Sequence, residues 1–157
     1  MAFPVTPVLR MAASPLPDLR ATFFLPVRVH PDSVASIHGV VLDVPVDDGL
    51  DTLAAYGNGS ARYINHSGYT VIWDVPDATN RLRPLVDDLL AAASAMHLPK
   101  PPTGWKTPGF RGASSHLTVL TRTGLASVAL GSDAASENLF GAGVALMTAL
   151  IDTVPRG

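Results

Sequence analysis

Short stretches rich in β-branched and aromatic residues, the clearest of which alternate apolar with polar positions, dominate the first half of the chain. This pattern is typical of half-buried β-strands. The stretches cover residues 22–29, 39–46, 50–56, 61–65 and 69–75. Pro26 has no amide hydrogen to donate, so we expect residues 22–29 to form an edge strand. The other four stretches follow one another closely and favour an antiparallel meander.

Turn signals separate the predicted strands. Asn58-Gly59 is the strongest short hairpin signal, because both residues tolerate the positive φ angles that a two-residue type I′ turn requires. His66, Ser67 and Gly68 give a second turn signal before the last strand of the meander. Both signals support antiparallel pairing of neighbouring strands.

A first helix is predicted over residues 82–96, where apolar residues recur at helical spacing and form a single stripe. Pro84 fits the first turn of a helix, because the amide donor that it lacks has no partner there. Thr79 or Asn80 is the nearest candidate for the N-cap, and Pro99 ends the helix.

The remaining chain contains a linker, a hairpin and a second helix. Residues 99–114 are rich in Pro and Gly and form a long connection. Residues 116–130 are predicted to form a hairpin. Ser132 or Asp133 then caps a C-terminal helix that extends to about Val154.

This order of elements predicts an α+β fold, in which an antiparallel β-meander sheet packs against two main helices. Residues 1–20 are rich in Pro and lack periodicity, so they are interpreted as an extended N-terminal arm. Residues 21–157 are predicted to form a single domain, which suits the length of 157 residues.

The composition excludes several classes of protein. The chain has no Cys, which excludes a disulfide scaffold, a Cys-ligated metal site and a thiol nucleophile. A net charge of −2 argues against nucleic acid as a partner. The longest uncharged apolar stretch, residues 139–151, is shorter than the about 20 residues that cross a bilayer. We therefore expect a cytoplasmic protein without a membrane span or a targeting segment.

The C-terminal helix is predicted to be apolar on all sides, because residues 139–151 carry no charge. In one interpretation the chain itself covers this helix on several sides, with help from the N-terminal arm. In the other, the helix forms the interface of a two-fold homodimer, and its small residues allow another backbone to approach closely. The residues assigned to this interface are Phe140, Gly141, Val144, Ala145, Met147 and Ile151.

The densest group of polar and aromatic side chains lies on the meander and is a candidate ligand pocket. Its residues are Arg62, Tyr63, Asn65, His66, Trp73 and Asp74. In such a pocket His66 would act as a general base, Asp74 would orient it, and Arg62 would hold an anion. Aromatic pairs between strands and ordinary turn chemistry explain the same residues without any ligand.

No metal site, cofactor or complete catalytic motif is predicted. The five His residues lack the short spacing of zinc ligands. The Gly-x-Gly of residues 57–59 joins two strands, whereas a phosphate-binding loop leads into a helix. Cations and aromatic residues interleave in the 99–114 linker, as they do in single-strand nucleic-acid sites. The acidic net charge and the aromatic content of 6% argue against nucleic acid there, so a lid, a partner-binding loop or a plain connector is expected instead.

The run Gly-Asn-Gly-Ser-Ala-Arg-Tyr-Ile-Asn-His-Ser-Gly at residues 57–68 resembles a group of bacterial proteins of unknown function. That resemblance implies kinship but no activity. The order of elements is also similar to that of roadblock and profilin-like domains, which implies a dimeric or partner-binding α+β module. The predicted N-terminal strand pair and the lack of an opening helix depart from that arrangement.

These features together predict a protein-interaction module without enzymatic activity, which self-associates through its C-terminal helix and binds a protein partner. The alternative is a small-molecule-binding protein or an enzyme that uses the candidate pocket on residues 61–75. Nucleic-acid binding through the 99–114 linker is a third and weaker hypothesis.

Overall fold

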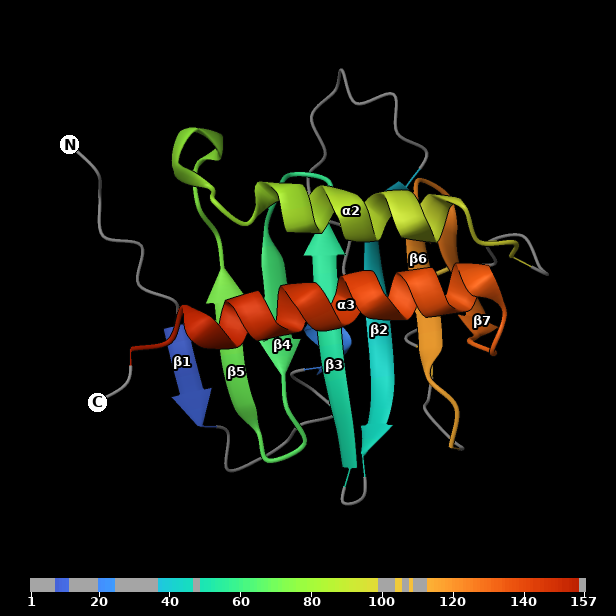
Figure 1. Ribbon diagram of the computed structural model, residues 1–157, viewed down its shortest axis with the longest axis horizontal. Coiled ribbons are helices and arrows are strands. Elements are labelled where there is room, and N and C mark those ends of the chain that lie inside the picture. Colours follow the sequence, from blue (N-terminus) through green and yellow to red (C-terminus); the bar gives the residue numbers. More distant parts are fainter. Residues whose placement is uncertain are drawn as a thin grey trace.

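The computed structural model describes residues 8–11, 20–24, 37–46, 49–98, 104, 105, 108 and 113–155, with the side chains of 8–11 left out. In this part of the chain, one antiparallel sheet carries two helices on one of its faces, which confirms the predicted α+β fold (Figure 1). The strands are β1 (Val8–Met11), β2 (Ile37–Val46), β3 (Gly49–Tyr56), β4 (Ala61–Ile64), β5 (Tyr69–Trp73), β6 (His116–Thr121) and β7 (Gly124–Ala129). Their order across the sheet is β1-β5-β4-β3-β2-β6-β7.

The predicted meander forms one half of the sheet. In this half, β2 pairs with β3, β3 with β4 and β4 with β5. The β6–β7 hairpin then pairs with β2, so the long strand β2 joins the meander to the hairpin. Consecutive strands that lie side by side are the common arrangement in antiparallel sheets.

Part of the predicted N-terminal arm is a strand of this sheet. Residues 8–11 form β1, which pairs with β5 from Val8 opposite Ile72 to Met11 opposite Tyr69. The remaining residues of the arm, 1–7 and 12–19, lie outside the described residues. The boundary between arm and domain at residue 20 stays a prediction.

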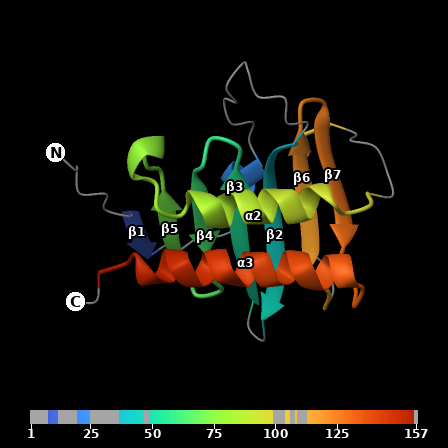
Figure 2. The ribbon, with the colours of Figure 1, turned by 45° about the horizontal axis from the view of Figure 1, so that its top comes forward.

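Two helices, α2 (Arg83–Ser94) and α3 (Ala134–Asp152), lie side by side on the same face of the sheet and run in opposite directions (Figures 1 and 2). Asp133 caps α3 as predicted, because its carboxylate accepts a hydrogen bond from the Ser136 backbone N–H. No side chain caps α2 at Leu82, although the Asn80 side-chain oxygen accepts a bond from the Leu82 N–H at 3.1 Å.

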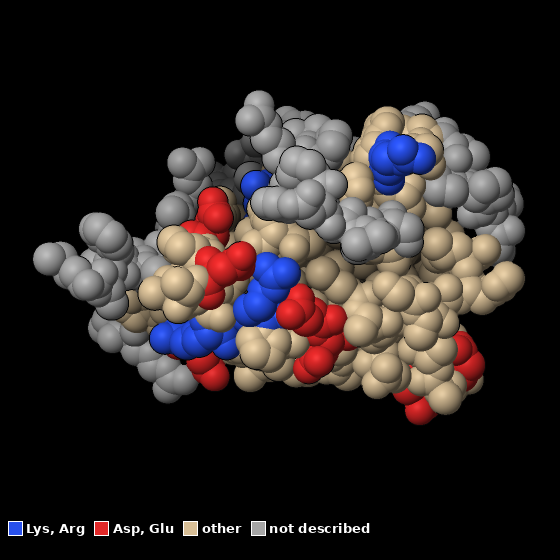
Figure 3. All heavy atoms as spheres, turned by 90° about the horizontal axis from the view of Figure 1, so that it is seen from above, with Lys and Arg blue, Asp and Glu red and all other residues tan. Residues whose placement is uncertain are grey.

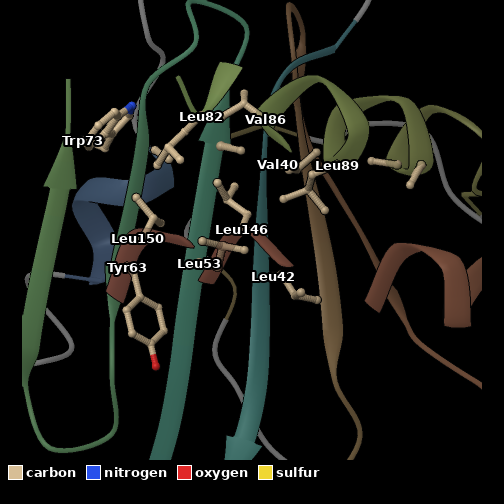
Figure 4. Close-up of a cluster of buried hydrophobic side chains, with 14 of the residues drawn as sticks. Val40, Leu42, Leu53, Tyr63, Trp73, Leu82, Val86, Leu89, Leu146 and Leu150 are labelled. Atoms are coloured by element: carbon tan, nitrogen blue, oxygen red, sulfur yellow. The ribbon is translucent and has the colours of Figure 1, made fainter. Parts of the chain in front are cut away.

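The main core lies between the helices and the sheet (Figure 4). The helices contribute buried residues at helical spacing, while each strand contributes alternate residues to this face. Fully buried examples are Val40, Leu42, Leu53, Val86, Leu89, Leu117, Val119, Leu139, Leu146 and Leu150. This burial accounts for the apolar stripe of α2 and for one face of α3.

A second apolar cluster covers the opposite face of the sheet. The strands contribute the residues that alternate with those of the main core, namely Val41, Ala54, Tyr56, Ile64, Leu120 and Leu125. Phe23 and Phe24 pack against them from the short 3-10 helix η1 (Thr22–Phe24). The Tyr56 hydroxyl donates a hydrogen bond of 2.7 Å to the Phe23 carbonyl oxygen, which anchors η1 on the sheet.

The edge strand predicted at residues 22–29 is wrong where the structure describes it. Residues 22–24 are helical, and residues 25–29 lie outside the described part of the chain. The physical reason is that Phe23 and Phe24 are adjacent and both buried on one side, whereas a strand sends neighbouring side chains to opposite faces.

The hairpin at Asn58 is confirmed, but its turn differs from the prediction. The Gly59 N–H bonds to the Tyr56 carbonyl, and the Tyr56 N–H bonds to the Ser60 carbonyl. The loop therefore contains three residues, 57–59, with Gly59 at φ +87°. A three-residue loop that ends on a left-handed Gly is the next most common hairpin after the two-residue type.

A buried ion pair joins η1 to the centre of the sheet. Arg20 donates two hydrogen bonds to Asp43, from Nε at 2.9 Å and from Nη2 at 2.6 Å, and a third to the Pro108 carbonyl at 2.8 Å. Thr52 donates to the same carboxylate at 2.8 Å. Asp43 is only 1% exposed, so its charge depends on these donors.

Candidate functional site

The six residues of the candidate pocket do not come together in one site. Arg62 and Tyr63 are neighbours on β4, so their side chains leave the sheet on opposite faces. The Arg62 guanidinium lies over the Tyr56 ring at 5.5 Å, on the face that carries the second cluster. Tyr63 lies on the face that carries the helices, in the main core.

Trp73 and Asn65 have structural roles. Trp73 is buried, and its indole N–H donates to the Asn80 side-chain oxygen at 2.9 Å. Asn80 also donates to the Gly59 carbonyl, which ties the first hairpin to the start of α2. The Asn65 side-chain oxygen accepts from the Ser67 and Tyr69 backbone N–H groups, so this residue shapes the turn between β4 and β5.

Asp74 does not orient His66, which corrects the arrangement that the sequence suggested. Asp74 is exposed just beyond the end of β5, while His66 lies in the turn that precedes this strand. A strand of five residues spans about 17 Å, which separates the two side chains. The partner of His66 is Asp51 on β3, and the sequence analysis missed it.

Asp51 links Tyr63 and His66 in a short hydrogen-bonded chain. The Tyr63 hydroxyl donates to Asp51 Oδ2 at 3.1 Å. The His66 backbone N–H donates to Asp51 Oδ1 at 2.7 Å, and His66 Nδ1 lies 3.0 Å from the same oxygen. Burial, together with the charge and hydrogen bond of Asp51, raises the pKa of the Tyr63 hydroxyl. Tyr63 therefore stays protonated, and its hydroxyl remains a donor to Asp51.

This chain lies where the sheet extends beyond α3. The Tyr63 hydroxyl points away from the labelled core residues, and β2 and β3 continue past α3 on the side away from α2 (Figures 1 and 4). The His66 side chain is 44% exposed and holds a carboxylate through Nδ1, which is an arrangement suited to a general base. Within the described residues, no group of three His, Asp or Glu side chains could hold a metal ion.

The residues assigned to the interface on α3 lie on two different sides of this helix. Its buried face consists of Ser136, Leu139, Gly143, Leu146 and Leu150. Phe140, Val144, Met147 and Ile151 recur every three or four residues and form one flank, which we call the α3 flank. Gly141 and Ala145 are turned by about 100° from this flank, towards α2.

The α3 flank is an exposed apolar surface. Phe140, Val144 and Ile151 are 39%, 43% and 51% exposed, and Met147 is half-buried. It lies on the side of α3 away from Gly141 and Ala145, which line a groove shared with α2, and on that side the sheet continues past α3 (Figure 1). Tyr69 is 40% exposed and lies on the same face of the sheet as the helices. The next residue on β5, Thr70, is buried on the opposite face, because neighbouring side chains of a strand point to opposite faces.

A groove of about 590 Å³ runs between α2 and α3 on their outer side. Most of its walls are small residues, which are Ala91 and Ala92 of α2, Ala95 at the C-cap of α2, and Gly141, Ala142 and Ala145 of α3. Leu85 and Asn138 also line it. Asp88 and Glu137 are the charged residues that line it. We refer to this feature as the α2–α3 groove.

Charges are unevenly distributed around the helices. Acidic and basic side chains lie beside one another at the start of α2, as seen from above (Figure 3). There, Arg83 contacts Asp77 at 3.0 Å and Asp87 at 3.1 Å. The side chains of Asp88 and Glu137, by contrast, form no hydrogen bond or ion pair with any residue that the structure describes. The groove therefore carries two acidic side chains that nothing in the described fold neutralises.

By length and composition alone, α3 is apolar enough to cross a membrane. The same helix packs Leu139, Leu146 and Leu150 against the sheet, so in this structure it is an element of the fold.

Comparison with known proteins gave no match, since no family model, no curated protein and no solved structure is significantly similar to the chain.

Proposed function

We propose that this protein is an interaction module without enzymatic activity, and that it self-associates through the α3 flank. The observation that carries this proposal is the exposure of three large apolar side chains, Phe140, Val144 and Ile151, on one flank of a helix. Large exposed apolar patches on folded proteins commonly mark interaction sites. No charged residue occurs between Glu137 and Asp152, so the flank offers nothing for a charged partner to pair with.

A second copy of the chain fits this surface, because a two-fold axis places an apolar flank against an identical apolar flank. The helix is about 28 Å long and about 10 Å wide, so one flank offers about 280 Å². A stable interface needs about 800 Å² on each partner. The sheet surface beyond α3, with Tyr69, lies next to the flank and would supply further contact area.

The dispersal of the candidate pocket supports an interaction module over an enzyme. Arg62 and Trp73 make structural contacts on opposite faces of the sheet, and Asp74 does not reach His66. The cytoplasmic location and the resemblance to bacterial proteins and to roadblock and profilin-like domains stay predictions.

The mass of the native protein and of a Val144→Glu variant tests self-association. We expect a wild-type dimer and a monomeric variant, because a buried unpaired carboxylate weakens the interface by about 100-fold or more. Asn138→Glu is the matched control, since it adds the same charge to the same helix outside the flank and leaves the dimer intact. A monomeric wild-type protein, or a dimeric Val144→Glu protein, would contradict the proposal.

A second candidate function, small-molecule binding or an enzymatic reaction, rests on the Tyr63–Asp51–His66 chain. This chain provides an oriented imidazole beside the uncovered part of the sheet. Native mass spectrometry of gently purified protein tests it, because a bound molecule appears as added mass. An adduct that persists in His66→Ala would exclude a role for this chain in holding the molecule.

A further inference from the structure

We propose that the α2–α3 groove binds an amphipathic, positively charged helix of a partner protein. This inference rests on the proposed role as an interaction module, but it uses a surface other than the α3 flank. The flank is free of charge and suits a second copy, whereas the groove contains two acidic residues that have no partner among the described residues, and it suits a basic partner.

The walls of the groove suit a helix. The α2 side presents mainly Ala beside Leu85, and the α3 side presents Ala and Gly. Such small side chains let the backbone of a third helix lie between the two existing ones. No described heavy atom outside its own helix lies within 4 Å of the position that a Cβ on Gly141 would take, so this wall is open. The volume of about 590 Å³ accommodates several apolar side chains of a partner.

The charges on the groove select the sign of the partner. Asp88 and Glu137 are both exposed and both lack a described partner. A helix with Lys or Arg beside its apolar stripe would place its cations against these carboxylates. The same carboxylates would repel an acidic helix and a second acidic copy of this chain.

The antiparallel arrangement of the helices also fixes the spacing of the cations. Glu137 lies in the first turn of α3 and therefore near the end of α2, where Ala95 lines the groove. Asp88 lies seven residues before Ala95 along α2, which corresponds to about 10 Å. A partner helix that contacts both carboxylates therefore carries its cations about seven residues, or two helical turns, apart.

A synthetic peptide serves as the probe. It is a fluorescent helix of about 18 residues, with Leu and Ala on one stripe and two Lys placed about seven residues apart beside the stripe. A matched peptide has Glu in place of both Lys. We expect the Lys peptide to bind the full-length protein at least about tenfold more tightly than the Glu peptide in a fluorescence anisotropy titration.

Three variants of the protein test the site itself. The double variant Asp88→Lys, Glu137→Lys should reverse the preference, so that the Glu peptide binds about tenfold more tightly than the Lys peptide. Ala145→Trp should abolish binding of the Lys peptide, because the indole fills the groove. Asp74→Lys is the control, since it makes one of these Asp-to-Lys changes at an exposed position that does not line the groove, and it should leave the peptide affinity unchanged.

The proposal is overturned if the Lys peptide does not bind, if both peptides bind equally, or if the double variant keeps the wild-type preference. It is also overturned if Ala145→Trp or the double variant converts a dimer into a monomer, because the groove would then belong to self-association. Loss of the dimer in Val144→Glu with unchanged peptide binding would support both proposals. A monomeric wild-type protein that binds the Lys peptide would contradict self-association alone.

Discussion

Gly143 of α3 lies directly over Leu42 of β2, and a Cβ built on Gly143 would stand 2.5 Å from Leu42 Cδ2. Leu42 is fully buried, so its side chain has little space to move. A Cβ built on Gly141, two residues earlier in the same helix, would meet no described heavy atom outside its helix within 4 Å. The two glycines therefore differ in role, because Gly143 sets the distance between α3 and the sheet while Gly141 keeps the α2–α3 groove open.

Substitution of the two glycines by Ala should change stability in opposite directions. Ala is a better helix former than Gly by about 1 kcal/mol, and Gly141→Ala should gain most of this amount. Gly143→Ala gains the same preference but forces Leu42 out of place, and such overpacking costs about 1–3 kcal/mol. We expect a net loss of about 1 kcal/mol. Urea unfolding of both variants checks this, and shifts of the same sign would show that α3 does not rest on β2 through Gly143.

The pair of Arg20 and Asp43 predicts a large loss of stability when one partner is removed. Arg20→Ala leaves the buried Asp43 carboxylate with Thr52 as the one side-chain donor among the described residues, and breaking a buried ion pair in this way costs about 3–5 kcal/mol. Asp74→Ala removes an exposed carboxylate and should change the free energy of unfolding by less than about 0.5 kcal/mol. Similar losses in both variants, measured by urea unfolding, would show that η1 is not held to the sheet by Arg20.

The elements that the sequence predicts well are those whose local pattern and tertiary environment agree. The central strands of the meander are rich in β-branched and apolar residues because both faces of the sheet are buried there, and α2 carries its stripe because only one of its sides is buried. Phe23 and Phe24 show the opposite case. Their neighbours suggest a strand, but the free energy of burying two adjacent rings on the same face outweighs that local preference.

The candidate site was harder to predict because it depends on strand register. Asp51 and His66 are 15 residues apart, and they meet only because Thr52 is paired with Ile64 across β3 and β4. A register shifted by one residue would send Asp51 to the other face. Asp74 is close to His66 in sequence. It follows Trp73 at one end of β5, however, whereas His66 precedes Tyr69 at the other end, so the strand holds the two side chains apart.

Trp73 and Asn80 predict a test of the link between the first hairpin and α2. Asn80→Ala removes the acceptor of the buried indole N–H and the donor to the Gly59 carbonyl, which should cost about 2–3 kcal/mol. In the Trp73→Phe background the indole N–H is absent, so the further loss from Asn80→Ala should be smaller by about 1 kcal/mol. Strictly additive losses in this double-mutant cycle, measured by thermal unfolding, would contradict a coupled pair.

Tyr56 predicts a loss of stability at alkaline pH. Burial raises the pKa of its hydroxyl from 10.0 to about 12, and the nearby Arg62 offsets only part of this effect. Because the folded state holds the proton more tightly than the unfolded state, the contribution to stability is complete below pH 10 and disappears as the pH rises through 12. A pKa difference of this size corresponds to about 2–3 kcal/mol.

Tyr56→Phe isolates this contribution from that of other tyrosines, since Tyr63 also has a raised pKa and titrates in both proteins. The variant loses the hydrogen bond to the Phe23 carbonyl and should be less stable than the wild type below pH 10, by about 1 kcal/mol. Urea unfolding between pH 10 and 12 should show the wild type losing stability more steeply than the variant, because only the wild type must ionise a buried hydroxyl between η1 and the sheet. Parallel pH profiles of the two proteins would mean that Tyr56 is exposed to solvent and that η1 does not cover this face of the sheet.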